Sequence, residues 1–154
     1  MKRALRPPTA VLLATALGLT MAPGAPGVRG DAPPGRYEVS DETVRDSQTG
    51  LLWQRSVSAD GYTWAQATAY CAGLTLAGQS GWRVPMVKEL RSLVDERRSR
   101  PAIDEAAFPG TPVEEFWTAV PHASDPSLTW VVSFYSGGVY QGLSGNLSRV
   151  RCVR

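Results

Sequence analysis

Metal-binding and nucleophilic side chains are scarce in this chain of 154 residues, which has a single histidine, His122, and two cysteines, Cys71 and Cys152. Zinc sites use three or four cysteine, histidine and carboxylate ligands, so we expect no zinc. His122 lies close to Asp125 in "PHASDP", but a catalytic pair also requires a nucleophile within hydrogen-bonding distance, which the sequence does not indicate. We therefore expect no catalytic residue and no enzymatic activity.

Carboxylates are too dispersed in the sequence to indicate an acid–base pair. Glu114 and Glu115 are neighbours in a predicted strand, where successive side chains point to opposite faces. Calcium needs only oxygen ligands, and carboxylates in predicted loops, such as Asp104, Glu105 and Asp125, keep a calcium site open. We expect no cofactor otherwise.

The predicted mature domain lacks a strong charge of either sign. The whole chain has 16 basic and 14 acidic residues, but residues 1–30 contain four of the basic residues and no acid. The remainder therefore has 12 basic and 14 acidic residues, a formal charge of −2. A domain near neutrality has no global field to hold a polyanion, so nucleic acid is not expected as a partner.

A hydrophobic segment long enough to span a membrane is also missing. The apolar run "TAVLLATALGLTMA" has 14 residues and follows the basic "MKRALRPP", which is typical of a secretory signal. We assign residues 1–22 to a signal peptide, with cleavage between residues 22 and 30. Residues 23–36 are rich in proline and glycine and are predicted to be a disordered leader. One domain, residues 37–154, follows without a transmembrane segment, and we expect it to be exported to the periplasm or the extracellular space.

Export determines how the two cysteines are interpreted. An oxidising compartment and an even count favour one disulfide between Cys71 and Cys152, worth roughly 4 kcal/mol in the chain-entropy model. The alternative is a pair of buried free thiols.

Two helices are predicted in the first half of the domain. Thr63 and Gln66 form a capping-box pattern, after which Trp64, Ala67, Cys71 and Leu74 fall on one face. The second helix is predicted to begin at Pro85, which suits the first helical position, and to end by "RRSRP". Its expected buried residues are Met86, Val87, Leu90, Leu93 and Val94, and its expected surface ion pair is Arg91 with Asp95.

Short strands flank these helices on both sides. "TVRD" and "LLWQ" around "SQTG" predict one hairpin, and "LTWVVSFYSGGVYQG" around Gly137 and Gly138 predicts another. "EEFWTAV" is a further strand candidate. "SRVRCVR" is predicted to be a final strand that buries Val150 and Cys152 and exposes Arg149 and Arg151. The predicted class is α+β, with two helices packed on short antiparallel strands.

Several motifs in this order resemble the Lcl C-terminal domain family of exported bacterial domains. They are "DSQTGLLWQ", "TWAQATAYCAGL", "LAGQSGWRVPMVKELRSLVD", "PAIDEAAFP", "FWTAV", "WVVSFYSGGV" and "VRCVR". The resemblance implies a C-type-lectin-like fold with paired N- and C-terminal strands. It also implies a disulfide from the first helix to the last strand, a "WR-P" signature at Trp82, Arg83 and Pro85, and strand tryptophans at Trp53 and Trp117.

The resemblance further implies adhesion to sulfated polysaccharide, an activity associated with one member of the family. The Glu-Pro-Asn and Trp-Asn-Asp motifs of calcium-dependent sugar-binding lectins are missing, which argues against calcium-mediated sugar chelation.

Six residues are candidates for contacting a ligand. The tryptophans Trp82, Trp117 and Trp130 could stack on sugar rings, although a small fold also uses tryptophan to fill its core. The arginine of the signature, Arg83, could bind a sulfate or carboxylate, but a role in anchoring the second helix is favoured. Arg149 and Arg151 could form an anion patch, or simply a solvated strand face.

The leading hypothesis is an exported, non-enzymatic recognition module that binds a glycan or cell-surface ligand through its loops. The alternative is a structural or protein-binding component of the cell envelope. A concave polar and aromatic site would favour a glycan, whereas a flat apolar surface would favour a protein partner.

Overall fold

The computed structural model describes residue 33 and residues 35–154 of the chain. The predicted signal peptide and most of the predicted leader lie outside these residues. Arg36, which was assigned to the leader, belongs to the folded unit. Its guanidinium lies 2.8 Å from the Asp46 carboxylate and donates a hydrogen bond of 2.7 Å to the carbonyl of Ser92.

The first sheet is a small antiparallel sheet near the start of the domain. Its strands, in the order β1-β2-β3, are β1 (Tyr37–Val39), β2 (Thr43–Asp46) and β3 (Leu52–Gln54). Val44 on β2 pairs with Trp53 on β3. The hairpin predicted from "TVRD" and "LLWQ" is confirmed, and β1 adds an outer strand that the sequence pattern did not predict.

The second sheet is also antiparallel, and it contains the longer strands. Its order is β4-β5-β6, with β4 (Glu115–Pro121), β5 (Leu128–Ser133) and β6 (Val139–Leu143). Both the "EEFWTAV" strand and the hairpin around Gly137 and Gly138 are confirmed. The backbone at Gly137 has φ of +79°, a left-handed conformation that glycine adopts without strain.

Helix α1 (Trp64–Gly73) forms as its sequence predicts. The Thr63 hydroxyl accepts a hydrogen bond from the Gln66 amide, and the Gln66 side chain accepts one from the Thr63 amide. Ala67 and Cys71 are buried on the predicted face. This local cap explains why α1 could be placed from sequence alone.

Helix α2 (Val87–Arg91) is shorter than predicted and begins two residues after Pro85. Met86, expected in the buried stripe, is 48 % exposed. The reason is that the Glu89 carboxylate folds back to accept a hydrogen bond of 2.8 Å from the Met86 amide, which fixes the helix start there.

The predicted ion pair between Arg91 and Asp95 is also wrong. Arg91 lies 3.7 Å from Glu96, whereas Asp95 is held by Arg97 at 2.9 Å and Arg98 at 3.5 Å. The pair fails because α2 ends at Arg91, so the four-residue spacing of a helix does not extend to Asp95.

The C-terminal segment is extended but forms only isolated bridges. Val153 pairs with both Trp53 and Arg83, and Leu52 and Arg154 exchange two backbone hydrogen bonds of 2.9 and 2.8 Å. The C-terminus is therefore paired with β3, the third strand of the N-terminal sheet. The predicted alternation is wrong at Arg151, which is fully buried together with Val150, Cys152 and Val153.

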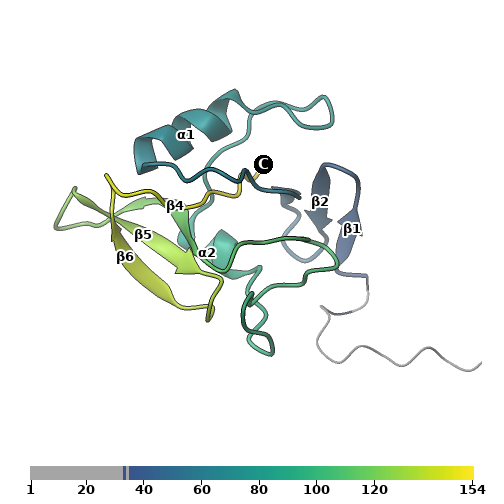
Figure 1. Cartoon of the computed structure of the whole chain (residues 1–154). Coiled ribbons are helices and arrows are strands. Elements are labelled where there is room, and N and C mark those ends of the chain that lie inside the picture. Colours follow the sequence, from purple (N-terminus) through teal and green to yellow (C-terminus); the bar gives the residue numbers. More distant parts are fainter. Residues whose placement is uncertain (1–32, 34) are drawn as a thin grey trace, which may run out of the picture.

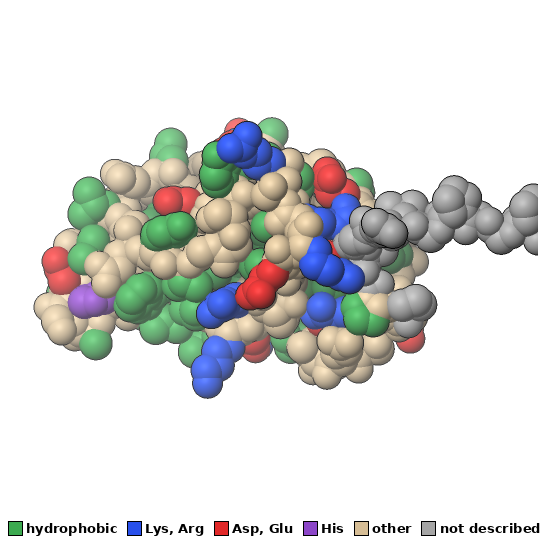
Figure 2. Space-filling view, turned by 90° about the horizontal axis from the view of Figure 1, so that it is seen from below, with side chains coloured by type: hydrophobic (Ala, Val, Ile, Leu, Met, Phe, Trp, Pro, Cys, Tyr) green, Lys and Arg blue, Asp and Glu red, His purple; other side chains and the backbone are tan. Residues whose placement is uncertain are grey.

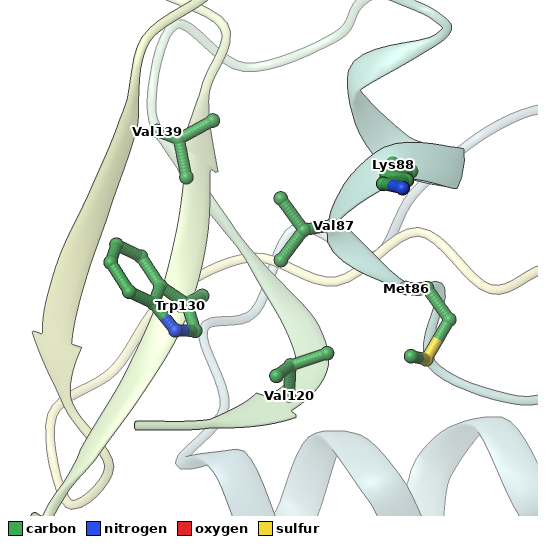
Figure 3. A pocket seen from close by; sticks show the side chains of 6 residues that line it. All are labelled: Met86, Val87, Lys88, Val120, Trp130 and Val139. Carbon is green, nitrogen blue, oxygen red and sulfur yellow. The ribbon is translucent and has the colours of Figure 1, made fainter. Parts of the chain in front are cut away.

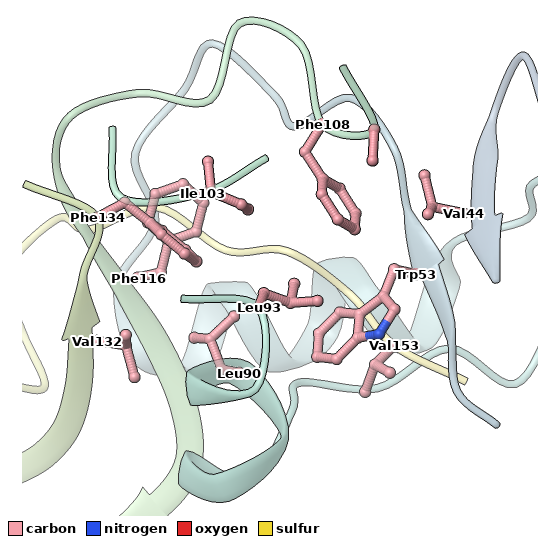
Figure 4. Packing of buried hydrophobic residues seen from close by; sticks show 11 residues of the cluster. Val44, Trp53, Leu90, Leu93, Ile103, Phe108, Phe116, Val132, Phe134 and Val153 are labelled. Atoms are coloured by element: carbon pink, nitrogen blue, oxygen red, sulfur yellow. The ribbon is translucent and has the colours of Figure 1, made fainter. Parts of the chain in front are cut away.

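The sheets, helices and C-terminal segment enclose a hydrophobic core. In Figure 1 the two sheets lie at opposite ends, with α2 and the yellow C-terminal segment between them and α1 above. Figure 4 shows the larger core cluster, in which Trp53, Phe108 and Leu93 come from three different parts of the chain. A second cluster contains Cys71, Trp82 and Trp117.

Over the described residues the architecture is α+β, as predicted, with two small antiparallel sheets and two short helices. Within residues 33 and 35–154, no helix is both long and apolar enough to cross a membrane.

Candidate functional site

An open apolar groove lies where α2 fails to cover the end of the second sheet. Because α2 has only five residues, it packs on part of β4 and β5 and leaves the rest of that face uncovered. The groove has a volume of about 580 Å³. Its lining comes from the start of α2 and from all three strands: Met86, Val87, Lys88, Val120, Trp130 and Val139.

The groove has two walls that face each other, one from the start of α2 and one from the second sheet. Figure 3 shows Val87 pointing from α2 toward Trp130 on β5 and Val139 on β6, with Val120 on β4 below them. Figure 2 shows hydrophobic side chains gathered at the end of the molecule that holds the second sheet, next to the histidine. Exposed apolar surface of this kind marks an interaction site more often than an isolated exposed residue does.

The start of α2 is held in place by the "GWRVP" stretch. The Trp82 indole is buried and donates a hydrogen bond of 2.8 Å to the carbonyl of Gln79. Arg83 holds Glu89 through two hydrogen bonds of 2.7 Å, and the Pro85 carbonyl accepts one from Ala119 on β4. These contacts fix one wall of the groove relative to the sheet that forms the other.

The ion pair between Arg83 and Glu89 changes the ionisation of both groups. The hydrogen bonds from Arg83 lower the pKa of the Glu89 carboxyl below its usual value, and the same contact raises the pKa of Arg83. The predicted anchoring role of Arg83 agrees with this geometry.

Lys88 supplies the groove's only charged lining residue. Its side chain is exposed and, within the described part of the chain, forms no ion pair. An apolar groove with one unpaired ammonium at its rim can bind an apolar group that lies next to an anion.

Two of the three candidate tryptophans are core residues. Trp117 is fully buried and donates a hydrogen bond of 2.7 Å to the carbonyl of Tyr62, and Trp82 is 2 % exposed. Trp130 alone lines the groove, with its ring centroid 5.6 Å from that of His122. Of these three indoles, only Trp130 offers a face to a ligand in this conformation.

The candidate arginines lie in separate environments and do not form one patch. Arg149 pairs with Glu114 at 2.9 Å and also donates to the carbonyl of Ala59. Arg151 is buried against Phe108, with its guanidinium 4.7 Å from the ring centroid. The structure thus gives Arg149 a surface ion pair and Arg151 an internal position.

Burial lowers the pKa of the Arg151 guanidinium to about 9, so the group remains charged at neutral pH. The charge is stabilised by the carbonyls of Gln54 and Arg55, at 2.7 and 2.5 Å, and by the Thr111 hydroxyl at 2.8 Å. Arg151 is therefore a structural residue that cross-links β3, the loop before β4 and the C-terminal segment.

The predicted disulfide between Cys71 and Cys152 is confirmed, with both cysteines fully buried. It joins α1 to the C-terminal segment across a sequence separation of 81. Both cysteines belong to the second core cluster, and neither lines the groove.

Two of the three carboxylates considered for calcium accept hydrogen bonds from nearby residues. Asp104 accepts hydrogen bonds from the amides of Ala106 and Ala107, and Asp125 accepts two from Ser127. Among the described residues, no three histidine, cysteine or acidic side chains gather in a way that could hold a metal ion.

Sequence reasoning missed most of the groove. Met86 and Val87 were assigned to a buried helix stripe, and Val120 and Val139 were simply strand residues. The signal that could have pointed to them is the short distance from Pro85 to the basic cluster before Pro101, which limits how much sheet the second helix can cover.

The family comparison covers most of the chain. The model of the Lcl C-terminal domain matches residues 42–154. No curated protein matches the chain with significant similarity.

Proposed function

Because the chain belongs to the Lcl C-terminal domain family, we propose that it is an exported, non-enzymatic recognition module that binds a protein partner through the apolar groove. The observation that carries this proposal is the lining, which consists of five apolar side chains with one unpaired ammonium at the rim. A protein segment with a large apolar side chain next to an aspartate or glutamate would complement it. The apolar group would fill the space between Val87 and Trp130, and the carboxylate would pair with Lys88.

A C-type-lectin-like fold is part of the same proposal. It is supported by the pairing of the C-terminal segment with β3 and by the disulfide from α1 to that segment. These are the features that the family resemblance implies.

Export and the lack of catalysis are supported by different observations. The buried disulfide suits an oxidising compartment, either the periplasm or the extracellular space. The groove lining contains no hydroxyl, thiol, imidazole or carboxylate that could act as nucleophile or base. Recognition here requires neither calcium nor another cofactor.

A second candidate function is binding of a sulfated polysaccharide. Trp130 and Lys88 favour it because they place an aromatic ring and an ammonium in one groove. A sugar ring could stack on the indole while its sulfate pairs with the lysine. Binding of a protein partner is preferred, because most of the remaining lining is aliphatic and offers no hydrogen bond to a sugar hydroxyl.

Selection from a random peptide display library on the purified oxidised protein tests the primary proposal. We expect enriched peptides to combine an aromatic or large aliphatic residue with a nearby acid. Their binding should fall at least about tenfold in Met86→Asp and in Lys88→Glu, since each change removes one half of the complementarity. Leu147→Asp, an exposed aliphatic position outside the groove, is the matched control and should bind normally.

A glycan array with the same variants separates the two functions. Saturable binding to sulfated glycans that is lost in Lys88→Glu, together with no enriched peptide, would overturn the protein reading in favour of the glycan. Repeating the array with calcium and with chelator tests whether a cation is needed.

A further inference from the structure

The free edge of the second sheet is β6, and it differs from the opposite edge. On β4, the amide of Trp117 donates to Arg149, the amide of Ala119 donates to Pro85, and the strand pairing is irregular between Trp117 and Pro121. These features cover or break that edge. On β6, the pairing with β5 is regular over all five residues, and within the described chain only the Leu143 carbonyl, which accepts from Asn146, has a backbone partner on the outer side.

In an antiparallel sheet the backbone groups of alternate residues point to the same neighbouring strand, and this alternation identifies which β6 groups point outward. Ser133 donates to the carbonyl of Gly138, and the amide of Ser144 donates to the carbonyl of Ser127. With this register, Tyr140 and Gly142 bond to β5, whereas the backbone groups of Val139, Gln141 and Leu143 face away from it. Within the described residues, the amides of these three residues have no acceptor.

β6 also has none of the devices that usually protect a sheet edge. Its sequence VYQGL contains no charge and no proline, and residues 126–148 contain no aspartate, glutamate, lysine, arginine or histidine. Tyr140 and Leu143 are 48 % and 53 % exposed. An uncharged, regular and partly apolar edge is a template for another strand.

We propose that β6 pairs with β6 of a second copy of this chain, across a two-fold axis at Gln141, to form a continuous six-stranded antiparallel sheet. In this register the outward-facing backbone groups of Gln141 meet those of the other Gln141, and Val139 meets Leu143 of the second copy. All three amides then face acceptors, although the Leu143 carbonyl already accepts a hydrogen bond of 2.8 Å from Asn146.

The side chains fit this self-pairing better than they fit a charged partner. Tyr140 would lie opposite Gly142 of the second copy, where no side chain projects and Trp117 and Val131 fill the place of a Cβ. Since residues 126–148 bear no charge, two copies meet without repulsion, and a basic or acidic strand would find no opposite charge. A second copy is therefore the occupant that this edge favours.

Pairing would place two apolar grooves on the same face of one sheet. The two-fold axis runs perpendicular to the sheet, so the groove-lining Val139 of each copy lies beside the shared edge. A partner with two binding segments could then engage both grooves, which raises its apparent affinity without any new contact. This consequence rests on the proposed function, whereas the pairing itself does not.

Site-specific oxidation of Gln141→Cys tests the pairing and its register together. The native cysteines are bridged, so the new thiol is the only free one among the described residues. Residues opposite each other on the axis are about 5.5 Å apart at Cα, within disulfide range. We expect a disulfide-linked homodimer to form at low micromolar protein, and to form much more slowly in Ser136→Cys, an exposed control in the neighbouring turn.

Sedimentation velocity of the unmodified protein provides the independent measurement. We expect a concentration-dependent dimer that weakens at least about tenfold in Gln141→Lys, which puts two ammonium groups on the axis, but not in Ser136→Lys. A monomer up to millimolar concentration, or equal cross-linking of Gln141→Cys and Ser136→Cys, would overturn the proposal. Neither readout uses a groove ligand, so failure here leaves the peptide-binding test unaffected.

Discussion

Arg151 is a buried charge that no acidic side chain neutralises in the described part of the chain. Two carbonyls, one hydroxyl and the face of Phe108 stabilise it instead. Charge-assisted hydrogen bonds to neutral acceptors are strong where water is excluded, and removing the donor leaves those acceptors without partners.

Arg151→Ala should lower the free energy of unfolding by about 3–5 kcal/mol, because it leaves a cavity and removes the donor from two carbonyls and from the Thr111 hydroxyl. Urea denaturation followed by fluorescence measures the loss. Arg45→Ala is the matched control, since Arg45 is exposed and makes only one hydrogen bond of 3.5 Å to the Gly50 carbonyl. Equal losses in the two variants would show that the internal position of Arg151 is unimportant.

The ion pair between Arg83 and Glu89 predicts an acid-sensitive contribution to stability. The folded state lowers the pKa of Glu89 below the value of 4.5 expected when the chain is unfolded, so the unfolded state binds the proton more readily. The contribution is therefore present above about pH 5 and is lost as the pH falls through the folded pKa. Because the Arg83 side chain is 47 % exposed, solvent limits it to about 1 kcal/mol or less.

Glu89→Gln should accordingly be less stable than the wild type at pH 7 and nearly as stable at pH 3. Urea unfolding at the two pH values gives the comparison. Glu38→Gln removes an exposed carboxyl without an ion pair among the described residues and should not change the pH dependence. A constant difference between wild type and Glu89→Gln across this range would contradict the assignment.

At the scale of single elements, α1 depends on its cap. Thr63→Ala removes the hydroxyl that accepts a hydrogen bond from the backbone N–H of Gln66, and it should destabilise the protein by about 1 kcal/mol. Thr75→Ala, at an exposed position after the helix, should change stability much less. The shift in urea midpoint measures both, and a null result for Thr63→Ala would mean that tertiary contacts alone fix the helix start.

Elements with local signals were predictable, and those that depend on distant contacts were not. The capping box and the Gly137 turn are encoded within a few residues, so α1 and the β5–β6 hairpin follow from sequence. The start of α2 depends on a side chain that returns from Glu89 to the Met86 amide, and this overrode the usual preference for proline at the first helical position.

The candidate site shows the same limit. Trp130 was a candidate ligand contact and does line the groove, but Trp82, Trp117 and Arg151 are enclosed by segments distant in sequence. The alternation that predicted an exposed Arg151 assumes a regular strand at a sheet surface. The C-terminal segment instead forms isolated bridges to other elements. The alternation of buried and exposed side chains that holds in a regular strand therefore does not apply there.

For the whole molecule, the disulfide is the main covalent constraint. Replacing Cys71 and Cys152 together with alanine should lower the free energy of unfolding by roughly 4 kcal/mol, since the unfolded chain regains the freedom of a loop closed across 81 positions. Comparison of oxidised and reduced wild-type protein by thermal unfolding measures the same effect without mutation. An unchanged midpoint after complete reduction would contradict it.

The position of this disulfide also sets a mechanical property. A pulling force applied between Gly35 and Arg154 passes from Cys71 to Cys152 through the covalent bond, so the residues between them bear no load. The force acts only on the first sheet, its connection to α1, α1 as far as Cys71 and the residues after Cys152. At about 3.6 Å per residue, the fully extended chain from Gly35 to Arg154 would be roughly 140 Å long with the disulfide and roughly 430 Å long without it. The groove and the β6 edge lie inside the shielded loop, so the pulling force does not act directly on the segments that form the binding surfaces.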